Sequence, residues 1–345
     1  MGLVLHVDKV AWHGQIDALA AGRPGLIPVA KANGYGFGTP RLAATAQAHG
    51  FTHLAVGTVS EAIEAAPHFG GQLTVLTPWD PRVEDPPILS ADVASRTVRT
   101  VSSLVAAERL AAMPATRIAV ELATPLMRFG LTPEQFAATA HLIDRPIEAL
   151  TLHLPLATCT FDEVARVVFA AMEAGLQAPE LQVSHLPAVA MERLAAETGL
   201  RVRPRIGSDL WLGGGTALSA TGTVRAVHAV GRRDRVGYRR ALVPGPGHIL
   251  VVDGGTAHGV GLSAVAAGMG VKRRVRTLVR DCVEAAGIVN SPFSLDGRRL
   301  RFADTPHAQV SMLWLRDGMR VPAVGEELTL NVRHTITHAD QVVEH

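Results

Sequence analysis

One lysine directly after an apolar run is the residue whose position most clearly suggests chemistry. Lys31 follows the run 26–30 (Leu-Ile-Pro-Val-Ala), which has the composition of a buried strand. A charge is costly to bury at such a place. The chain contains only three lysines against thirty arginines. Position 31 therefore keeps a lysine, whose amine can lose its proton, where an arginine could not.

The glycines after Lys31 strengthen a chemical interpretation. Gly34, Gly36 and Gly38 alternate with two aromatic residues. They let the backbone approach a ligand closely, or adopt positive φ, before a helix that begins near Pro40. A neutral lysine amine can bond covalently to a carbonyl compound, and pyridoxal phosphate is the common cofactor of this kind. The alternative is a lysine that extends to the surface and has no chemical role.

Composition limits the class of protein. With 345 residues, the chain is long enough for one large domain and a smaller one. A hydrophobic content of 48% and a net charge of +2 are typical of a globular protein and do not favour nucleic-acid binding. Cys159 and Cys282 have no partners at metal or redox spacing, so we expect no metal and a reduced, cytoplasmic setting. No signal sequence or apolar run of about 20 residues is present, so no membrane association is expected.

The first two thirds of the chain repeat a short apolar strand followed by a helical pattern. Helices are predicted at 9–21, 39–49, 60–66, 103–112, 133–143, 161–175 and 187–199, and the one between the third and fourth strands is short and broken by Pro86 and Pro87. Eight such strands predict a (β/α)8 TIM barrel over residues 9–222, with functional groups at the C-terminal strand ends. A doubly wound open sheet is the alternative. The predicted strands are 26–30, 53–58, 73–77, 97–101, 117–122, 147–152, 181–184 and 202–206.

The pattern changes after the glycines at 213–215. Segments that alternate or are rich in β-formers follow, separated by Gly, Pro and Arg-Asp turns. We therefore predict a mostly-β domain over residues 223–345, which also includes a strand in residues 1–8. Its predicted strands are 224–230, 236–242, 248–252, 300–302, 310–315 and 328–332.

The segment 29–38 (Val-Ala-Lys-Ala-Asn-Gly-Tyr-Gly-Phe-Gly) resembles the cofactor-binding signature of alanine racemases, which are fold-type III pyridoxal phosphate enzymes. The resemblance implies that Lys31 bonds covalently to pyridoxal phosphate and that Tyr35 lies at the cofactor. Arg128, in the sequence Met-Arg-Phe-Gly, matches the arginine that supports cofactor oxygens and the substrate carboxylate. Seven residues earlier, Glu121 stands where the family often carries a carboxylated lysine, and we expect it to pair with Arg128.

Further matches follow the last three barrel strands. His153 matches the family histidine that orients the catalytic tyrosine. Ser184, before a predicted helix, and Gly207 with Ser208, after the eighth strand, are the expected phosphate ligands. Arg205 resembles the arginine facing the pyridine nitrogen, with Arg203 as a nearby alternative. A permanent cation there disfavours protonation of that nitrogen, which speaks against decarboxylation.

Only two tyrosines occur in the chain, and the second, Tyr238, resembles the catalytic tyrosine of the family. In the family this residue comes from the partner subunit, which implies a homodimer with shared active sites. The departures lie in the β domain. Thr256 and Leu330 stand at two usual tyrosine positions, and His307, expected on the substrate side, stands where a methionine is usual.

The resulting expectation is a pyridoxal phosphate-dependent racemase of alanine or another small amino acid, with Lys31 and Tyr238 exchanging a proton on opposite faces. Two alternatives remain. One is another fold-type III reaction, either decarboxylation or β-elimination. The other is a non-catalytic protein that binds pyridoxal phosphate.

Overall fold

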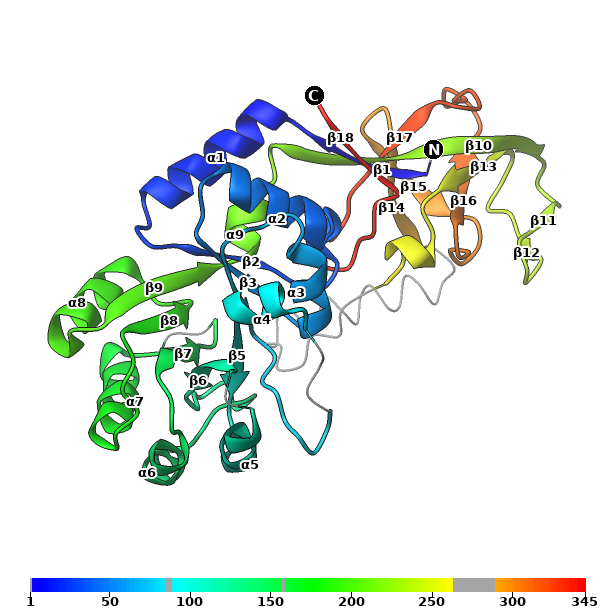
Figure 1. The fold of residues 1–345 in the computed structure, drawn as a ribbon. Coiled ribbons are helices and arrows are strands. Elements are labelled where there is room, and N and C mark those ends of the chain that lie inside the picture. The colour runs from blue at the N-terminus through cyan, green and yellow to red at the C-terminus, as the bar shows by residue number, and fades with distance from the viewer. Residues whose placement is uncertain (1, 85–88, 114, 157–158, 263–288) are drawn as a thin grey trace. The chain divides into compact units, whose positions relative to one another are not determined.

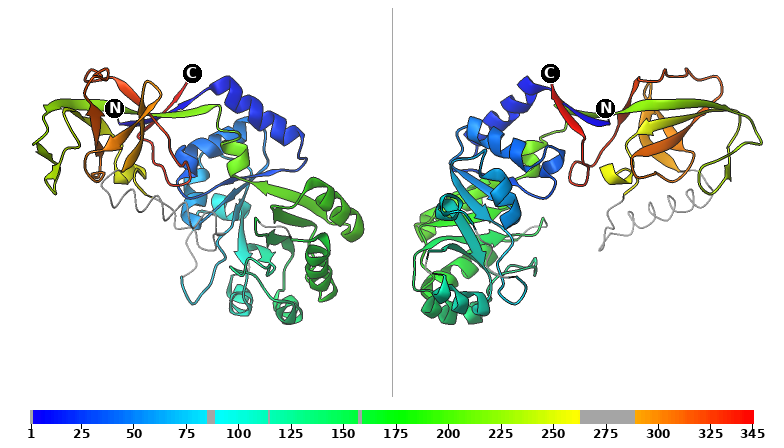
Figure 2. Two further views of the ribbon diagram at one scale, coloured as in Figure 1. Left: turned by 180° about the vertical axis from the view of Figure 1, so that it is seen from behind. Right: turned by 45° about the vertical axis from the view of Figure 1, so that its right-hand side comes forward.

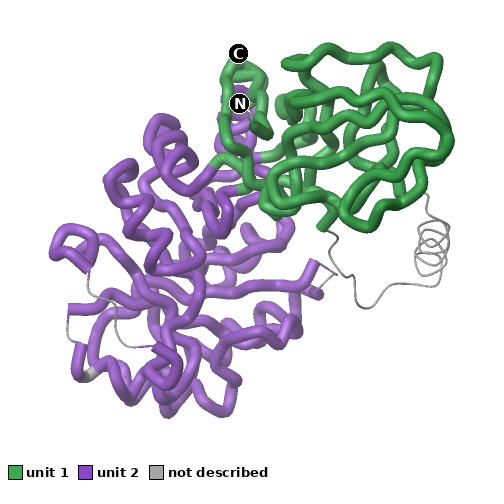
Figure 3. The backbone as a smooth tube through the Cα atoms, turned by 90° about the vertical axis from the view of Figure 1, so that its right-hand side faces the viewer, with its two compact units in different colours: residues 1–12, 35–37, 212–345 green, residues 13–34, 38–211 purple. Residues whose placement is uncertain are grey.

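The computed structural model describes residues 2–84, 89–113, 115–156, 159–262 and 289–345, and it divides into two compact units. Figure 3 colours them separately. The first unit contains residues 1–12, 35–37 and 212–345, and the second contains residues 13–34 and 38–211. The predicted division after residue 222 stays a prediction.

The second unit is built on a closed barrel in which every neighbouring pair of strands is parallel. The last strand pairs with the first, since Ile27 lies opposite Arg205. This confirms the (β/α)8 prediction and excludes the open sheet. The barrel strands are β2 (Ile27–Ala30), β3 (His53–Val56), β4 (Gln72–Val75), β5 (Thr97–Val101), β6 (Arg117–Glu121), β7 (Ile147–His153), β8 (Glu180–Ser184) and β9 (Arg201–Ile206).

Helices follow the barrel strands in sequence, as Figures 1 and 2 show. Two of them begin with a capping box. The side chains of Thr58 and Thr160 each accept from the backbone N–H of the glutamate three residues on, and that glutamate's carboxylate accepts from the threonine backbone N–H. Pro86 and Pro87 lie outside the described residues. The helices are α1 (Lys9–Ala21), α2 (Thr39–Ala48), α3 (Val59–Ala65), α4 (Ala91–Arg96), α5 (Leu104–Arg109), α6 (Pro133–Leu142), α7 (Phe161–Glu173), α8 (Ala188–Thr198) and α9 (Ser208–Trp211), with short 3-10 turns at η1 (Gly34–Gly36), η2 (Leu110–Ala112) and η3 (Thr256–His258).

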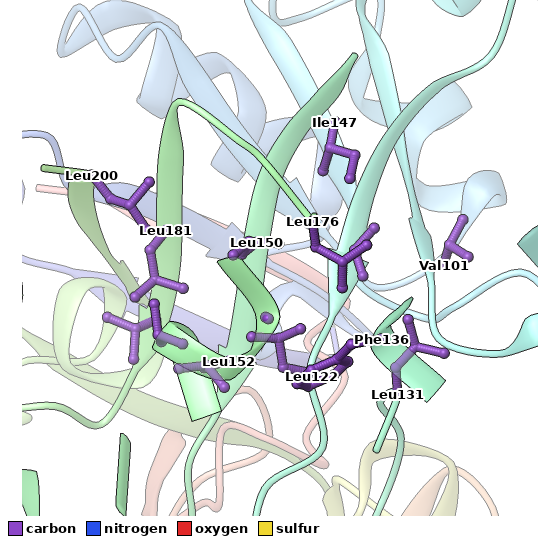
Figure 4. Close-up of a cluster of buried hydrophobic side chains, with 14 of the residues drawn as sticks. Val101, Leu122, Leu131, Phe136, Ile147, Leu150, Leu152, Leu176, Leu181 and Leu200 are labelled. Atoms are coloured by element: carbon purple, nitrogen blue, oxygen red, sulfur yellow. The ribbon is translucent and has the colours of Figure 1, made fainter. Parts of the chain in front are cut away.

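The main apolar core of the barrel unit lies between the strands and the outer helices (Figure 4). On β8, Leu181 and Val183 belong to this core. Side chains alternate along a strand, so Glu180, Gln182 and Ser184 point to the barrel axis. The barrel interior therefore carries polar groups, and those near the C-terminal strand ends are available to a ligand.

The first unit contains an eight-stranded sheet in the order β13-β16-β15-β14-β17-β10-β1-β18, with a further pairing of β13 to β10. Its core includes Leu250, Phe293 and Leu313, all fully buried. The prediction of a mostly-β part is confirmed. The strands are β1 (Leu3–Val7), β10 (Leu218–Val230), β13 (Gly247–Asp253), β14 (Asn290–Leu295), β15 (Arg298–Phe302), β16 (Val310–Arg316), β17 (Glu327–Leu330) and β18 (Gln341–Glu344).

One predicted strand is wrong. Residues 236–242 form a hairpin rather than a single strand, with β11 (Arg235–Val236) antiparallel to β12 (Ala241–Leu242). The chain turns between them because Gly237 and Arg240 adopt positive φ, at 73° and 49°. Tyr238 therefore lies in a turn. None of the described helices is long and apolar enough to span a membrane.

Candidate active site

Lys31 comes directly after β2, at the barrel rim formed by the C-terminal strand ends. The carboxylate of Glu61 joins the segments that follow β2 and β3. It accepts from the N–H of Ala32 at 2.9 Å and from the N–H of Gly57 at 2.6 Å. A Cβ at Gly57 would lie 2.7 Å from Glu61 Oε2 and 3.2 Å from the Lys31 Cβ, so any other residue here would displace the Glu61 carboxylate. The turn that carries the amine is therefore fixed by a neighbouring turn.

The electrostatic environment favours a neutral amine at Lys31. Burial is the largest cause of a lowered Lys31 pKa, and the guanidinium groups of Arg128 and Arg205 lower it further, while Glu61 opposes them. A neutral lysine amine is the form that bonds to a carbonyl carbon. The rim thus shifts Lys31 toward the neutral form that bonding to a carbonyl compound requires.

Arg205 is the most deeply placed cation of this rim. Only 7% of the residue is exposed, and its Nη2 donates to the Leu152 carbonyl at 2.8 Å. Its buried Nε has no hydrogen-bond partner among the described residues. Burial lowers the pKa of Arg205 to about 10, although Glu121 opposes the shift. This buried donor can therefore bind an acceptor atom of a ligand or an ordered water.

His153, at the end of β7, stays neutral. Burial, followed by the charges of Arg128, Arg205 and Lys31, lowers the pKa of His153 to about 3. Its ring meets the ring of His185 edge-on, with centroids 5.6 Å apart. A neutral imidazole can donate from one nitrogen and accept at the other.

The expected ion pair between Glu121 and Arg128 is not formed. Arg128 is exposed, and its guanidinium lies 5.2 Å from the centre of the Phe129 ring. Glu121 is 4% exposed, and burial raises its pKa against the opposing charges of Arg205, which acts more strongly, and Arg128. The acid at position 121 therefore acts mainly on the buried arginine, because the loop of Arg128 turns outward after β6.

The predicted phosphate ligands lie at the end of β8 and directly after β9. Ser184 is buried and lies opposite His153 in the strand register. Gly207 and Ser208 open α9, where the Gly207 carbonyl accepts from two N–H groups of that turn. The Trp211 indole N–H donates to the Val29 carbonyl at 2.8 Å, which ties α9 to the strand before Lys31.

Two of the three arginines of β9, Arg203 and Arg205, extend toward opposite ends of the barrel. Arg203 donates to the Gly25 carbonyl at 2.7 Å and to His53 Nδ1 at 2.8 Å, and it pairs with Glu180 at 3.5 Å. His53 and Glu180 begin their strands, whereas Lys31 and His153 stand at strand ends. Of the two candidates for the pyridine nitrogen, only Arg205 belongs to the rim of Lys31.

The remaining predicted residues belong to the first unit. Tyr35 is buried, and Leu330 is buried within β17. Tyr238 is 84% exposed, and its ring lies 4.6 Å from that of His307, centroid to centroid. Asp304 accepts from the Tyr238 N–H at 2.8 Å and contacts His307 Nε2 at 3.3 Å. Asp304 is not among the residues predicted from the sequence, although it stands three positions before His307.

A sequence model described as the N-terminal domain of alanine racemase matches residues 14–203, more than half of the chain. This chain belongs to the alanine racemase family. The alanine racemase of Mycobacterium tuberculosis is 38% identical over 122 residues, which are 34% of this chain and 31% of that protein. That of Levilactobacillus brevis is 35% identical over 149 residues, 40% of this chain and 39% of the relative. The match thus spans about a third of the length of these relatives.

Solved racemase structures share the fold over the whole chain. Alanine racemase from Bartonella henselae, with covalently bound pyridoxal phosphate, has a TM-score of 0.70 at 12% identity and is covered completely by this chain. The enzyme from E. faecalis has a TM-score of 0.70 at 18% identity, with 100% of this chain and 98% of that one covered. The architecture of an alanine racemase, barrel and β part together, is therefore present, as the signature around Lys31 predicted.

Proposed function

We propose that this protein is a pyridoxal phosphate-dependent racemase of alanine or another small amino acid, acting in the cytoplasm as a homodimer. The observation that carries the proposal is the Lys31 amine, held at the barrel rim with a lowered pKa beside two arginines. Membership of the alanine racemase family supports the same conclusion.

The residues of the barrel rim fit pyridoxal phosphate. The Lys31 amine would hold the cofactor aldehyde. Arg205, whose buried Nε has no hydrogen-bond partner in the described part of the chain, would hold an acceptor on the pyridine ring. Ser184, Gly207 and Ser208 are our candidates for the phosphate. We assign Arg128 to cofactor oxygens and the substrate carboxylate, and His153 and Tyr35 to the cofactor surroundings, from the family resemblance.

The chemistry divides between cofactor and protein. When bound, pyridoxal phosphate acts as an electron sink that acidifies the Cα–H bond of an amino acid. Once the substrate amine has displaced it from the cofactor, the Lys31 amine would take or return the proton on one face of Cα, and Tyr238 of the partner subunit would serve the opposite face. The exposure of Tyr238, at 84%, leaves its phenol available to a second copy of the chain. His307 then lies on the substrate side together with it.

Covalent capture tests the cofactor assignment independently of turnover. Borohydride treatment of the holoprotein should fix the cofactor to the peptide that carries Lys31. The Lys31→Ala variant should lose this label. Lys9→Ala is a matched control, because Lys9 is an exposed lysine whose amine lies 3.7 Å from Glu344. Labelling elsewhere, or none, would refute the proposed role of Lys31.

Incubation with single-enantiomer amino acids in D2O tests the reaction. Exchange at Cα with inversion supports a racemase, whereas exchange with loss of the amino acid indicates decarboxylation or elimination. A bound but inert cofactor indicates a non-catalytic binding protein. The Tyr238→Phe variant should slow proton removal from one enantiomer much more than from the other, while cofactor binding is retained. An equal loss for both enantiomers would contradict the assignment of two bases.

A further inference from the structure

The turn that carries Tyr238 is built around a buried carboxylate. Asp304 lies just after β15, and its side chain is only 4% exposed. One of its oxygens, Oδ2, accepts the Tyr238 backbone N–H at 2.8 Å and lies 3.3 Å from His307 Nε2. A single atom thus joins the backbone of one residue to the side chain of another, 69 positions apart along the chain.

The glycine before Tyr238 shows how closely the carboxylate approaches the turn. A Cβ at Gly237 would lie 2.1 Å from Asp304 Oδ2, and Gly237 also has a φ of 73°. Any other residue would displace the carboxylate and strain the backbone. The Asp304 carboxylate can therefore approach the turn only because residue 237 is a glycine.

The carboxylate is ionised. Burial alone would raise the pKa of Asp304, but hydrogen bonds from the Tyr238 N–H, from His307 and from the Thr305 N–H, together with the charge of His307, place it below the ordinary value. An ionised carboxylate accepts hydrogen bonds and donates none. His307 must therefore present Nε2 as N–H, which fixes its tautomer when the ring is neutral and leaves Nδ1 as the acceptor.

The imidazole held in this way lies against the phenol. The rings of Tyr238 and His307 are 4.6 Å apart, centroid to centroid, and tilted by 41°. The backbone of His307 is fixed as well, since its N–H donates to the Val310 carbonyl at 2.9 Å and its carbonyl accepts from Thr256 at 2.8 Å. Of the two rings, His307 is held at both backbone and side chain, whereas Tyr238 is mostly exposed.

We propose that Asp304 is a positioning residue that holds Tyr238 and His307 together as one proton-exchanging unit. This inference rests on the proposed racemase function and deepens it, because it assigns a role to an acid outside the residues of the family signature. His307, expected on the substrate side, also becomes the ring that orients the phenol. The Tyr238 phenol exchanges the proton. The Asp304 carboxylate only positions that phenol, through its bonds to the Tyr238 backbone and to the His307 imidazole.

The test compares proton exchange on the two faces of Cα. In the holoenzyme, Asp304→Asn should slow exchange from the enantiomer served by Tyr238 by up to about 100-fold, as a misplaced catalytic group does. Exchange from the other enantiomer should be nearly unchanged. The same substitution in a Tyr238→Phe background should add little, because residues that act as a unit are not additive. Asp317→Asn, at an exposed acid of the same unit, is the matched control.

A second measurement does not depend on activity. With only two tyrosines in the chain, protein labelled with ¹³C at tyrosine Cζ alone should give two ring resonances, which Tyr35→Phe would assign. Asp304→Asn and His307→Gln should shift the Tyr238 resonance in the apoprotein, since both alter the imidazole beside it. Asp317→Asn should leave it in place.

The outcomes separate the two proposals. If wild type inverts amino acids while Asp304→Asn slows both enantiomers equally, or neither, and leaves the Tyr238 resonance unmoved, the positioning role is refuted and the racemase remains. If wild type binds the cofactor but exchanges no Cα proton, the proposed function fails and this inference fails with it.

Discussion

Removing Arg203 should destabilise the barrel without changing the chemistry at its other rim. The residue is 6% exposed, and Arg203→Met deletes its bonds to the Gly25 carbonyl at 2.7 Å and to His53 Nδ1 at 2.8 Å. It also removes one partner of the buried Glu180 carboxylate. Breaking a buried ion pair costs about 3–5 kcal/mol, because one charge is left uncompensated.

The lower end of this range applies here. Glu180 keeps a bond from Arg201 at 2.6 Å and one from Gln182 at 2.9 Å, so its charge retains two partners. We therefore expect a loss of about 3 kcal/mol in the free energy of unfolding. Urea unfolding of the apoprotein, followed by circular dichroism, measures this loss as a lower midpoint.

Arg205→Met is the matched variant, because it removes a guanidinium from the same strand at the opposite rim. It should alter the absorbance of bound pyridoxal phosphate, whereas Arg203→Met should leave that absorbance unchanged in the folded fraction. The reasoning is refuted if Arg203→Met unfolds at the wild-type urea midpoint, or if the folded variant shows the changed absorbance expected for position 205.

Three further predictions concern single side chains. Burial is the main cause that lowers the pKa of His53 to about 4. Between about pH 6.5 and pH 4 the unfolded state therefore binds a proton that the folded state does not, and stability falls as pH falls. Urea midpoints at pH 7 and pH 5 should differ less in His53→Asn than in wild type, and an equal difference would contradict this. Gly57→Ala should displace the Glu61 carboxylate, cost about 1–3 kcal/mol and weaken cofactor retention in a dialysis assay; full retention at wild-type stability would count against the described turn. Trp211→Phe leaves the Val29 carbonyl without its indole donor and should cost about 1–3 kcal/mol of unfolding free energy, with thermal unfolding as the measurement and an unchanged melting temperature as the contrary result.

The barrel could be predicted from sequence because its strands are short, apolar and regularly separated by capped helices. All eight lie where expected, and the strand 97–101 agrees at both ends. The hairpin around Tyr238 could not be predicted in this way. Its strands have two residues each, too few for an alternating pattern, and the turn depends on Asp304, a distant acid that only the fold brings to the backbone.

The sequence predicted which residues lie at the candidate site better than it predicted which of them contact one another. Lys31, His153 and Arg205 could be placed at one rim because parallel strands bring their C-terminal ends together. The partner of Glu121 could not, because sequence spacing does not show that Arg128 lies on a loop that turns outward over Phe129. Nor does spacing separate Arg203 from Arg205. Both arginines lie on one face of β9, with Pro204 between them on the other face. Only their partners on the neighbouring strands show toward which end of the barrel each side chain extends.

The charges at this rim explain why a lysine is retained in a chain that otherwise uses arginine. Arg128 and Arg205 both lower the pKa of Lys31 and of His153, and both oppose the rise at Glu121. The rim therefore keeps permanent positive charge for phosphate and carboxylate groups, while its titratable bases are pushed toward their neutral forms. An arginine at position 31 would add a third permanent cation and remove the amine. Among the described residues of this rim Lys31 alone carries an amine, and its lowered pKa suits the bond to a cofactor aldehyde proposed above.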